Sequence, residues 1–106
     1  MIKVIREKIV KAGCIRWLKR NMEGIAWWYC PVDPSRSGLP DMLLCISGCF
    51  FWFEFKAGKG GRVSKIQKWE HERLKKAGAV GSVIRTVEEF NFFMDEHIRR
   101  RPWIRK

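Results

Sequence analysis

The sequence lacks the features that mark several large classes of protein. No run of apolar residues reaches the roughly 18 that a membrane-spanning helix needs. The basic N-terminal segment has no continuous apolar core of the kind found in secretion signals, so we expect a cytoplasmic protein. The four cysteines form no C-x-x-C pair, and the two histidines do not give a zinc-finger spacing. Reduced, structural thiols are therefore expected.

Acidic residues are also scarce. Eleven Asp and Glu residues against 22 Lys and Arg residues give the chain a net charge of +11. An excess of this size predicts partners rather than a fold. Nucleic acid is the first candidate, and an anionic membrane surface is the second. A solvated basic surface without a polyanionic partner is the third.

The hydrophobic pattern and the length of 106 residues predict one domain over 1–106, with a basic C-terminal tail at about 99–106. The elements are expected in the order α-β-β-β-α-β-α. Residues 2–22 predict one helix, or two with a break at Gly13. Later helices begin at Ser64 and Thr86, each with a Gln or Glu three residues on that completes a capping box. Four strands are expected, over 25–30, 42–46, 50–55 and 79–85.

The second and third of these strands are apolar on both faces. A strand that is buried on both sides needs helices on both sides of its sheet. The sequence therefore predicts a three-layer α/β arrangement.

Two acids stand at unusual positions in this apolar region, Asp41 at its start and Glu54 near its end. If Ser47-Gly48 is a two-residue turn, the register places Asp41 opposite Glu54, and Lys56 projects from the same face. Adjacent carboxylates repel each other, or one of them keeps its proton. A hard divalent cation such as Mg²⁺ or Mn²⁺ would remove this conflict. The alternative is a pair of acids at the strand ends in salt bridges with Lys56 and nearby arginines.

A metal site in so basic a chain points to hydrolysis of a phosphate backbone. The metal would polarise a phosphoryl oxygen and activate a water, and Lys56 would hold that water or stabilise the developing charge. The glycine-rich segment after the site supplies basic side chains that position DNA without reading its sequence. These are Lys59, Arg62, Lys65 and Lys68.

The motif Pro40-Asp41 with Glu54-Phe55-Lys56 resembles that of the PD-(D/E)xK nuclease superfamily. Its surroundings resemble one branch, the virus-type replication-repair nuclease (VRR-NUC) domain. In that branch a glycine precedes the Pro-Asp step, a Gly/Lys-rich loop follows the lysine, and a glutamine lies in the next helix, matched here by Gly38 and Gln67. The resemblance covers about 2–93 and implies a restriction-endonuclease-like core, with a central mixed sheet flanked by helices.

The resemblance also implies roles for particular residues. Asp41, Glu54 and the backbone oxygen of Phe55 would hold the metal, and Lys56 would be the catalytic lysine. Gln67 would lie beside the active site, in addition to its capping role. Glu7 matches a metal-binding glutamate on the first helix; its alternative is a solvated helix acid.

The implied activity is that of a Mg²⁺- or Mn²⁺-dependent endodeoxyribonuclease. Stand-alone members resemble phage-encoded homodimers that cut branched DNA such as Holliday junctions, without a membrane partner. A general nickase of duplex or flapped DNA and a non-catalytic DNA-binding protein are the alternatives. The tail at 99–106 is either a phosphate contact or a disordered end, and the segment 24–37 is core, dimer surface or DNA-contacting loop. Four tryptophans are candidates for a dimer interface or for the core: Trp17, Trp27, Trp28 and Trp69.

Overall fold

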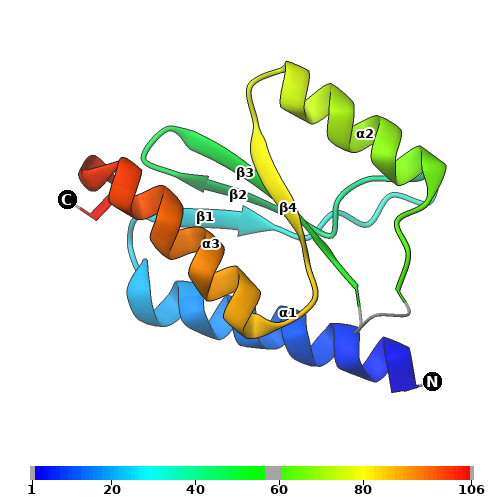
Figure 1. Cartoon of the computed structure of the whole chain (residues 1–106), viewed down its shortest axis with the longest axis horizontal. Helices are drawn as coiled ribbons and strands as arrows, with labels where there is room; N and C mark the ends of the chain where they lie inside the picture. The colour runs from blue at the N-terminus through cyan, green and yellow to red at the C-terminus, as the bar shows by residue number, and fades with distance from the viewer. Residues whose placement is uncertain (1, 57–60, 106) are drawn as a thin grey trace.

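The computed structural model describes residues 2–56 and 61–105 (Figure 1). Its elements follow the expected order, with one short 3₁₀ helix added at the end. They are α1 (Ile2–Asn21), β1 (Ala26–Tyr29), β2 (Met42–Ile46), β3 (Cys49–Phe55), α2 (Lys65–Lys76), β4 (Val80–Ile84), α3 (Val87–Arg100) and η1 (Pro102–Arg105). Within the described residues, no helix combines the length and the apolar character that crossing a membrane requires.

The strands form one mixed sheet, as the resemblance implied, and their order in it is β1-β2-β3-β4. Strands β2 and β3 pair antiparallel in the expected register, with Leu44 opposite Phe51 and Ile46 opposite Cys49. Ser47 and Gly48 make the turn between them with φ values of 49° and 82°. Positive φ at both central residues is the geometry whose twist suits a two-residue hairpin. Strand β4 then adds parallel to β3.

One face of the sheet packs on α1 and α3 and holds most of the core. Phe51 and Phe53 of β3 make edge-to-face contacts with Phe93 and Phe90 of α3. Helix α1 is a single helix through Gly13, which decides between the two expected forms. A Cβ at Gly13 would lie 2.5 Å from the side chain of Val87, so this glycine lets α1 approach the start of α3.

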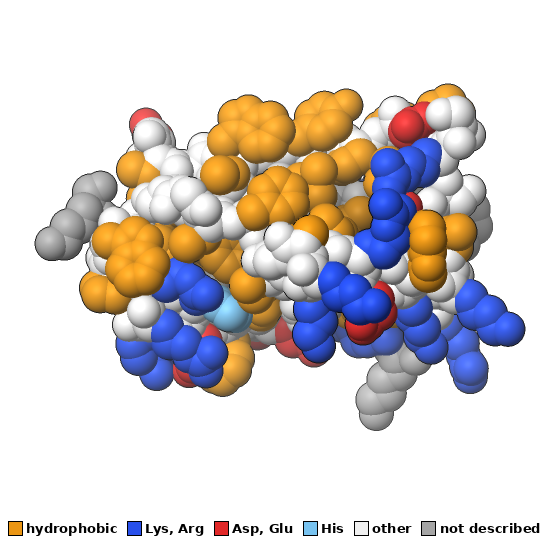
Figure 2. All heavy atoms as spheres, turned by 90° about the horizontal axis from the view of Figure 1, so that it is seen from above, with side chains coloured by type: hydrophobic (Ala, Val, Ile, Leu, Met, Phe, Trp, Pro, Cys, Tyr) orange, Lys and Arg blue, Asp and Glu red, His pale blue; other side chains and the backbone are white. Residues whose placement is uncertain are grey.

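The other face is covered only in part, which corrects the prediction that β2 is buried on both sides. Helix α2 lies over β4 (Figure 1). Its His71 also makes a ring contact with Trp52 of β3. Leu43 and Cys45 of β2 are only half-buried on this face, because among the described elements no helix packs closely on this side of β1 and β2. Trp27 and Tyr29 of β1 are 60% and 53% exposed there. Figure 2, a view from the side of α2, shows hydrophobic side chains gathered over a broad area.

Two local features near the C-terminus differ from expectation. Thr86 caps α3 by accepting the N–H of Glu89, but the carboxylate of Glu89 accepts the N–H of Arg85. In the predicted capping box Glu89 would accept the N–H of Thr86; in the structure it accepts the N–H of the residue before. The tail forms η1, where Ile104 is fully buried in the core, so of the two alternatives for the tail a disordered end does not hold at Ile104.

Candidate active site

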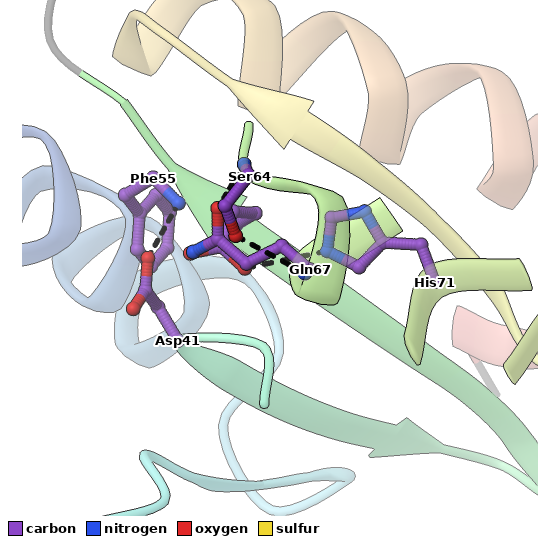
Figure 3. A network of polar contacts seen from close by, with 6 residues as sticks. Asp41, Phe55, Ser64, Gln67 and His71 are labelled. Carbon is purple, nitrogen blue, oxygen red and sulfur yellow. Dashed lines mark hydrogen bonds and ion pairs between the residues drawn. The ribbon is translucent and has the colours of Figure 1, made fainter. Parts of the chain in front are cut away.

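The hairpin brings Asp41 and Glu54 together at the open end of β2 and β3. Met42 pairs with Phe53, so the next position outward sets Asp41 beside Glu54. An oxygen of Asp41 (Oδ2) accepts the backbone N–H of Phe55 at 2.8 Å, which fixes this carboxylate against β3 (Figure 3). Glu54 is only 1% exposed. The juxtaposition predicted from the register is therefore present.

The first turn of α2 supplies a partner for Glu54. Gln67 Nε2 donates to Glu54 Oε2 at 3.0 Å, while Gln67 Oε1 accepts the backbone N–H of Ser64 at 2.9 Å. The Ser64 hydroxyl accepts the N–H of Gln67 in return, which completes the predicted capping box. The side-chain amide of Gln67 thus caps the helix and contacts the candidate site at once, so both expected placements hold.

His71 is a member of this cluster that the sequence argument missed. Its Nε2 lies 3.3 Å from Glu54 Oε1, and its ring stacks on Trp52 at a centroid distance of 4.1 Å. Gln67 and His71 are four residues apart on α2, so their side chains share one face of the helix. This four-residue spacing is the sequence signal that places His71 on the same side of the helix as Gln67.

Burial dominates the electrostatics of Glu54. Desolvation is the largest of the effects that raise its pKa from 4.5 to about 9. A side-chain hydrogen bond and the charge of Asp41 raise it further, Lys56 opposes them, and Glu7 adds a smaller increase. At neutral pH the metal-free protein therefore keeps a proton on Glu54. Burial, followed by the charge of Lys56, lowers the pKa of His71, which favours its neutral ring.

Lys56 follows Phe55 at the end of β3, and its positive charge lowers the pKa of both Glu54 and His71. Its backbone N–H donates to Ile84 O at 3.0 Å, which holds this end of β3 against β4. Among the described residues, neither Asp41 nor Glu54 has a lysine or arginine within salt-bridge distance. The alternative of a simple salt-bridged acid pair is therefore disfavoured.

Helix α1 closes one side of the site. A pocket of about 200 Å³ is lined by Glu7, Lys8 and Lys11 of α1 together with Asp41 and Phe55. The structure thus places Glu7 in the same pocket as Asp41, and its role as a metal ligand stays a prediction. Lys8 and Lys11 were not singled out in the sequence, although they follow Glu7 by one and four residues. A larger pocket, of about 790 Å³, lies between β4 and α3 and has none of these side chains in its lining.

The donors at this site suit a hard divalent cation. Two carboxylates, the backbone oxygen of Phe55 and the nearby Glu7 carboxylate are all oxygen ligands, which Mg²⁺ prefers. In the described part of the chain, no three His, Cys, Asp or Glu side chains are already gathered at metal-binding distance. Mg²⁺ commonly uses one or two carboxylates and completes its shell with water. Such a cation would take the place of the proton on the buried Glu54 and balance the negative charges of Glu54 and Asp41.

The loop before Asp41 is held against α2. Gly38 has a φ of +85°, and a Cβ there would lie 2.9 Å from the backbone oxygen of Ile66. Arg36 donates twice to the buried carboxylate of Glu70, at 2.8 and 3.0 Å. These contacts hold the stretch just before Asp41 against α2.

The predicted phosphate contacts are less closely tied to the cluster. Lys65 and Lys68 are exposed on the first turn of α2, on the same helix as Gln67, and Arg62 is exposed just before that helix. Lys59 lies outside the described residues. The exposed positions leave these three side chains accessible to a polyanion.

Comparison with solved structures finds this fold in a chain described as "VRR_NUC domain". The match covers 85% of this chain and 95% of that chain, with a TM-score of 0.74 and 22% sequence identity. The chain therefore has the fold of a VRR-NUC domain, as its motifs suggested. No protein-family model matches the sequence, and no curated protein matches it.

Proposed function

We propose that the protein is a metal-dependent DNA endonuclease. The observation that carries the proposal is the cluster of Asp41, Glu54 and Lys56 at one end of the β2-β3 hairpin, in which burial and Asp41 keep a proton on Glu54. A site that suppresses the charge of its own carboxylate is one that a cation would complete. The fold shared with a VRR_NUC domain and the net charge of +11 support the same activity.

Asp41, Glu54, the backbone oxygen of Phe55 and Glu7 would hold Mg²⁺ or Mn²⁺. When bound, the cation supplies Lewis-acid polarisation of a phosphoryl oxygen and lowers the pKa of water. Lys56 contributes a positive charge, which stabilises the negative charge that develops on the phosphate during attack. Gln67 keeps the Glu54 carboxylate oriented through its 3.0 Å hydrogen bond.

DNA would reach the site along basic side chains from two helices. Lys8 and Lys11 of α1 line the pocket beside Asp41, and Lys65 and Lys68 are exposed on α2. Contacts of this kind bind phosphates and fix the orientation of a duplex without specifying its sequence. Selection by DNA shape is consistent with this arrangement.

For the substrate we propose branched DNA, including four-way junctions, cut by a homodimer. Two copies related by a two-fold axis would present two sites for paired cuts. The uncovered face of β1 and β2, with Trp27 and Tyr29 exposed, is the surface that supports self-association. Of the other tryptophan candidates, Trp69 is exposed on α2, whereas Trp17 and Trp28 pack against the core.

The test is cleavage of a labelled four-way junction, a flap and a linear duplex, each in Mg²⁺, Mn²⁺ or EDTA. We expect cutting with either metal, none in EDTA, and preference for the junction. Asp41→Asn and Lys56→Ala should abolish cutting by the folded protein and leave DNA binding in place. Binding without any cleavage in either metal would favour the non-catalytic alternative, and equal cutting of all three substrates would favour a general nickase.

A further inference from the structure

The buried side of α2 presents two side chains to the same carboxylate. Gln67 Nε2 lies 3.0 Å from Glu54 Oε2, and His71 Nε2 lies 3.3 Å from Glu54 Oε1. His71 is only 9% exposed, and Figure 3 shows its ring directed at the polar network. Each oxygen of Glu54 therefore has its own nitrogen neighbour, and both nitrogens come from one rigid element.

The imidazole ring of His71 also stacks on a neighbouring aromatic ring of the sheet. It lies on the indole of Trp52 at a centroid distance of 4.1 Å and an interplanar angle of 22°. Trp52 is paired across the sheet with Gly81, and a Cβ at Gly81 would lie 2.1 Å from the indole ring. Only a glycine leaves room for this indole, so β4 sets the height and tilt of the His71 ring.

We infer that His71 is a positioning residue for Glu54, and that it donates its Nε2 hydrogen to Oε1 so that the carboxylate faces the cation site with a fixed orientation. The inference rests on the proposed function, because it takes Glu54 as a metal ligand. The terminal torsion of a glutamate is broad when nothing holds it. Hydrogen-bond partners behind a ligating side chain restrict it, and their loss commonly costs about 10–100-fold in metal affinity.

A different role for His71 is to fill space against Trp52. Two substitutions separate the roles, since each keeps one property of the histidine and removes the other. His71→Phe keeps a flat ring on Trp52 but has no N–H group. His71→Gln keeps an N–H donor of similar reach but loses the ring.

The experiment measures Mn²⁺ binding to DNA-free protein by electron paramagnetic resonance, together with the thermal unfolding temperature. Cleavage is then titrated with Mg²⁺. We expect His71→Phe to unfold near the wild-type temperature and to bind Mn²⁺ about 10–100-fold more weakly. His71→Gln should recover much of that affinity at a lower unfolding temperature. The control is His97→Phe, because His97 packs on Phe51 and Phe93 on the opposite face and should leave both metal readouts unchanged.

The outcomes separate this inference from the proposed function. Wild-type cleavage with unchanged Mn²⁺ affinity in His71→Phe would overturn the positioning role and leave the nuclease in place. A wild-type protein that neither binds Mn²⁺ nor cuts DNA would overturn both. If His71→Phe fails to fold, His71→Met replaces it as a donor-free variant of the same length as His71→Gln, and equal affinity of these two would overturn the inference.

Discussion

Glu54 is a buried carboxylate whose environment opposes its ionisation. It is 1% exposed, and its pKa of about 9 results first from desolvation and then from Asp41. The unfolded chain releases this proton near pH 4.5, whereas the folded protein keeps it up to about pH 9. The folded state therefore binds more protons in that window, and its stability falls as the pH rises. A carboxylate whose ionisation destabilises the fold is consistent with the proposed cation site, because a bound cation would stabilise its charged form.

The substitution Glu54→Gln tests this cost because glutamine cannot ionise. In EDTA at pH 8 we expect the variant to unfold at a higher temperature than the wild type, by about 4 °C or more, which corresponds to ~1 kcal/mol. At pH 5 the difference should be smaller, and cleavage should be lost at either pH. Thermal unfolding followed by circular dichroism measures the shift.

Glu70→Gln is the matched control for this prediction. Glu70 is also buried, but its carboxylate accepts two hydrogen bonds from Arg36. Removing its charge should lower the unfolding temperature. A stabilisation by Glu54→Gln that is equal at pH 5 and pH 8 would contradict the proposed proton on Glu54.

At the scale of elements, α2 organises the site. The first two turns of α2 contain its N-terminal cap and its contact with Glu54. They also contact the loop that precedes Asp41. Gly38 is one of the points where the loop before Asp41 touches α2, and it has the backbone conformation that favours glycine. The glycine that the VRR-NUC resemblance singled out thus has a physical role in this chain.

Gly38→Ala should destabilise the protein and displace Asp41. The left-handed conformation alone costs a side chain about 1–2 kcal/mol, and the new Cβ would also press on the backbone of Ile66. Gly24→Ala is the matched control: Gly24 has a φ of +82°, and no described atom lies within 4 Å of its added Cβ. Urea unfolding should show at least about twice the loss at Gly38, and only Gly38→Ala should slow cleavage. Equal losses would mean that the contact with Ile66 is unimportant.

At the scale of the whole molecule, net charge would govern the proposed encounter with DNA. The chain has a net charge of +11, and each phosphate contact releases bound counterions when it forms. If Lys65 and Lys68 contact phosphates, replacing either with Gln should lower the slope of log affinity against log salt by about 1. Fluorescence anisotropy at several salt concentrations measures this slope.

Lys76 provides the control for the salt prediction. It lies at the other end of α2, about 16 Å from Lys65 along the helix axis. Lys76→Gln removes the same charge and should leave the slope unchanged. An equal change for all three lysines would indicate diffuse attraction rather than specific phosphate contacts.

The exposed face of β1 and β2 is the surface proposed to join two copies of the chain. Trp27 is 60% exposed, on the face of β1 and β2 that the described helices leave uncovered. We expect the wild type to be a dimer in size-exclusion chromatography with light scattering, and Trp27→Gln to shift it toward the monomer. Phe92→Gln is the control, since Phe92 is 69% exposed but lies on α3. A wild type that stays monomeric at all concentrations would contradict the proposed homodimer.

The sequence by itself determined the hairpin, its register and the pairing of Asp41 with Glu54. These depend on a two-residue turn and on the alternation of side chains along a strand, both of which are local. The helix starts at Ser64 and Thr86 are local for the same reason, because a cap is formed by neighbours in the chain. The VRR-NUC resemblance added Glu7 and Gln67, and the structure places both beside the pair.

Only the tertiary structure decided which residues surround that pair. His71 reaches Glu54 because of where α2 packs on the sheet, and Trp52 lies over Gly81 because of the register between β3 and β4. The open face of β1 and β2 likewise follows from where α2 lies. The apolar pattern of β2 specifies burial but not the element that provides it. Such contacts join segments far apart in the chain, and their geometry depends on packing that no local period encodes.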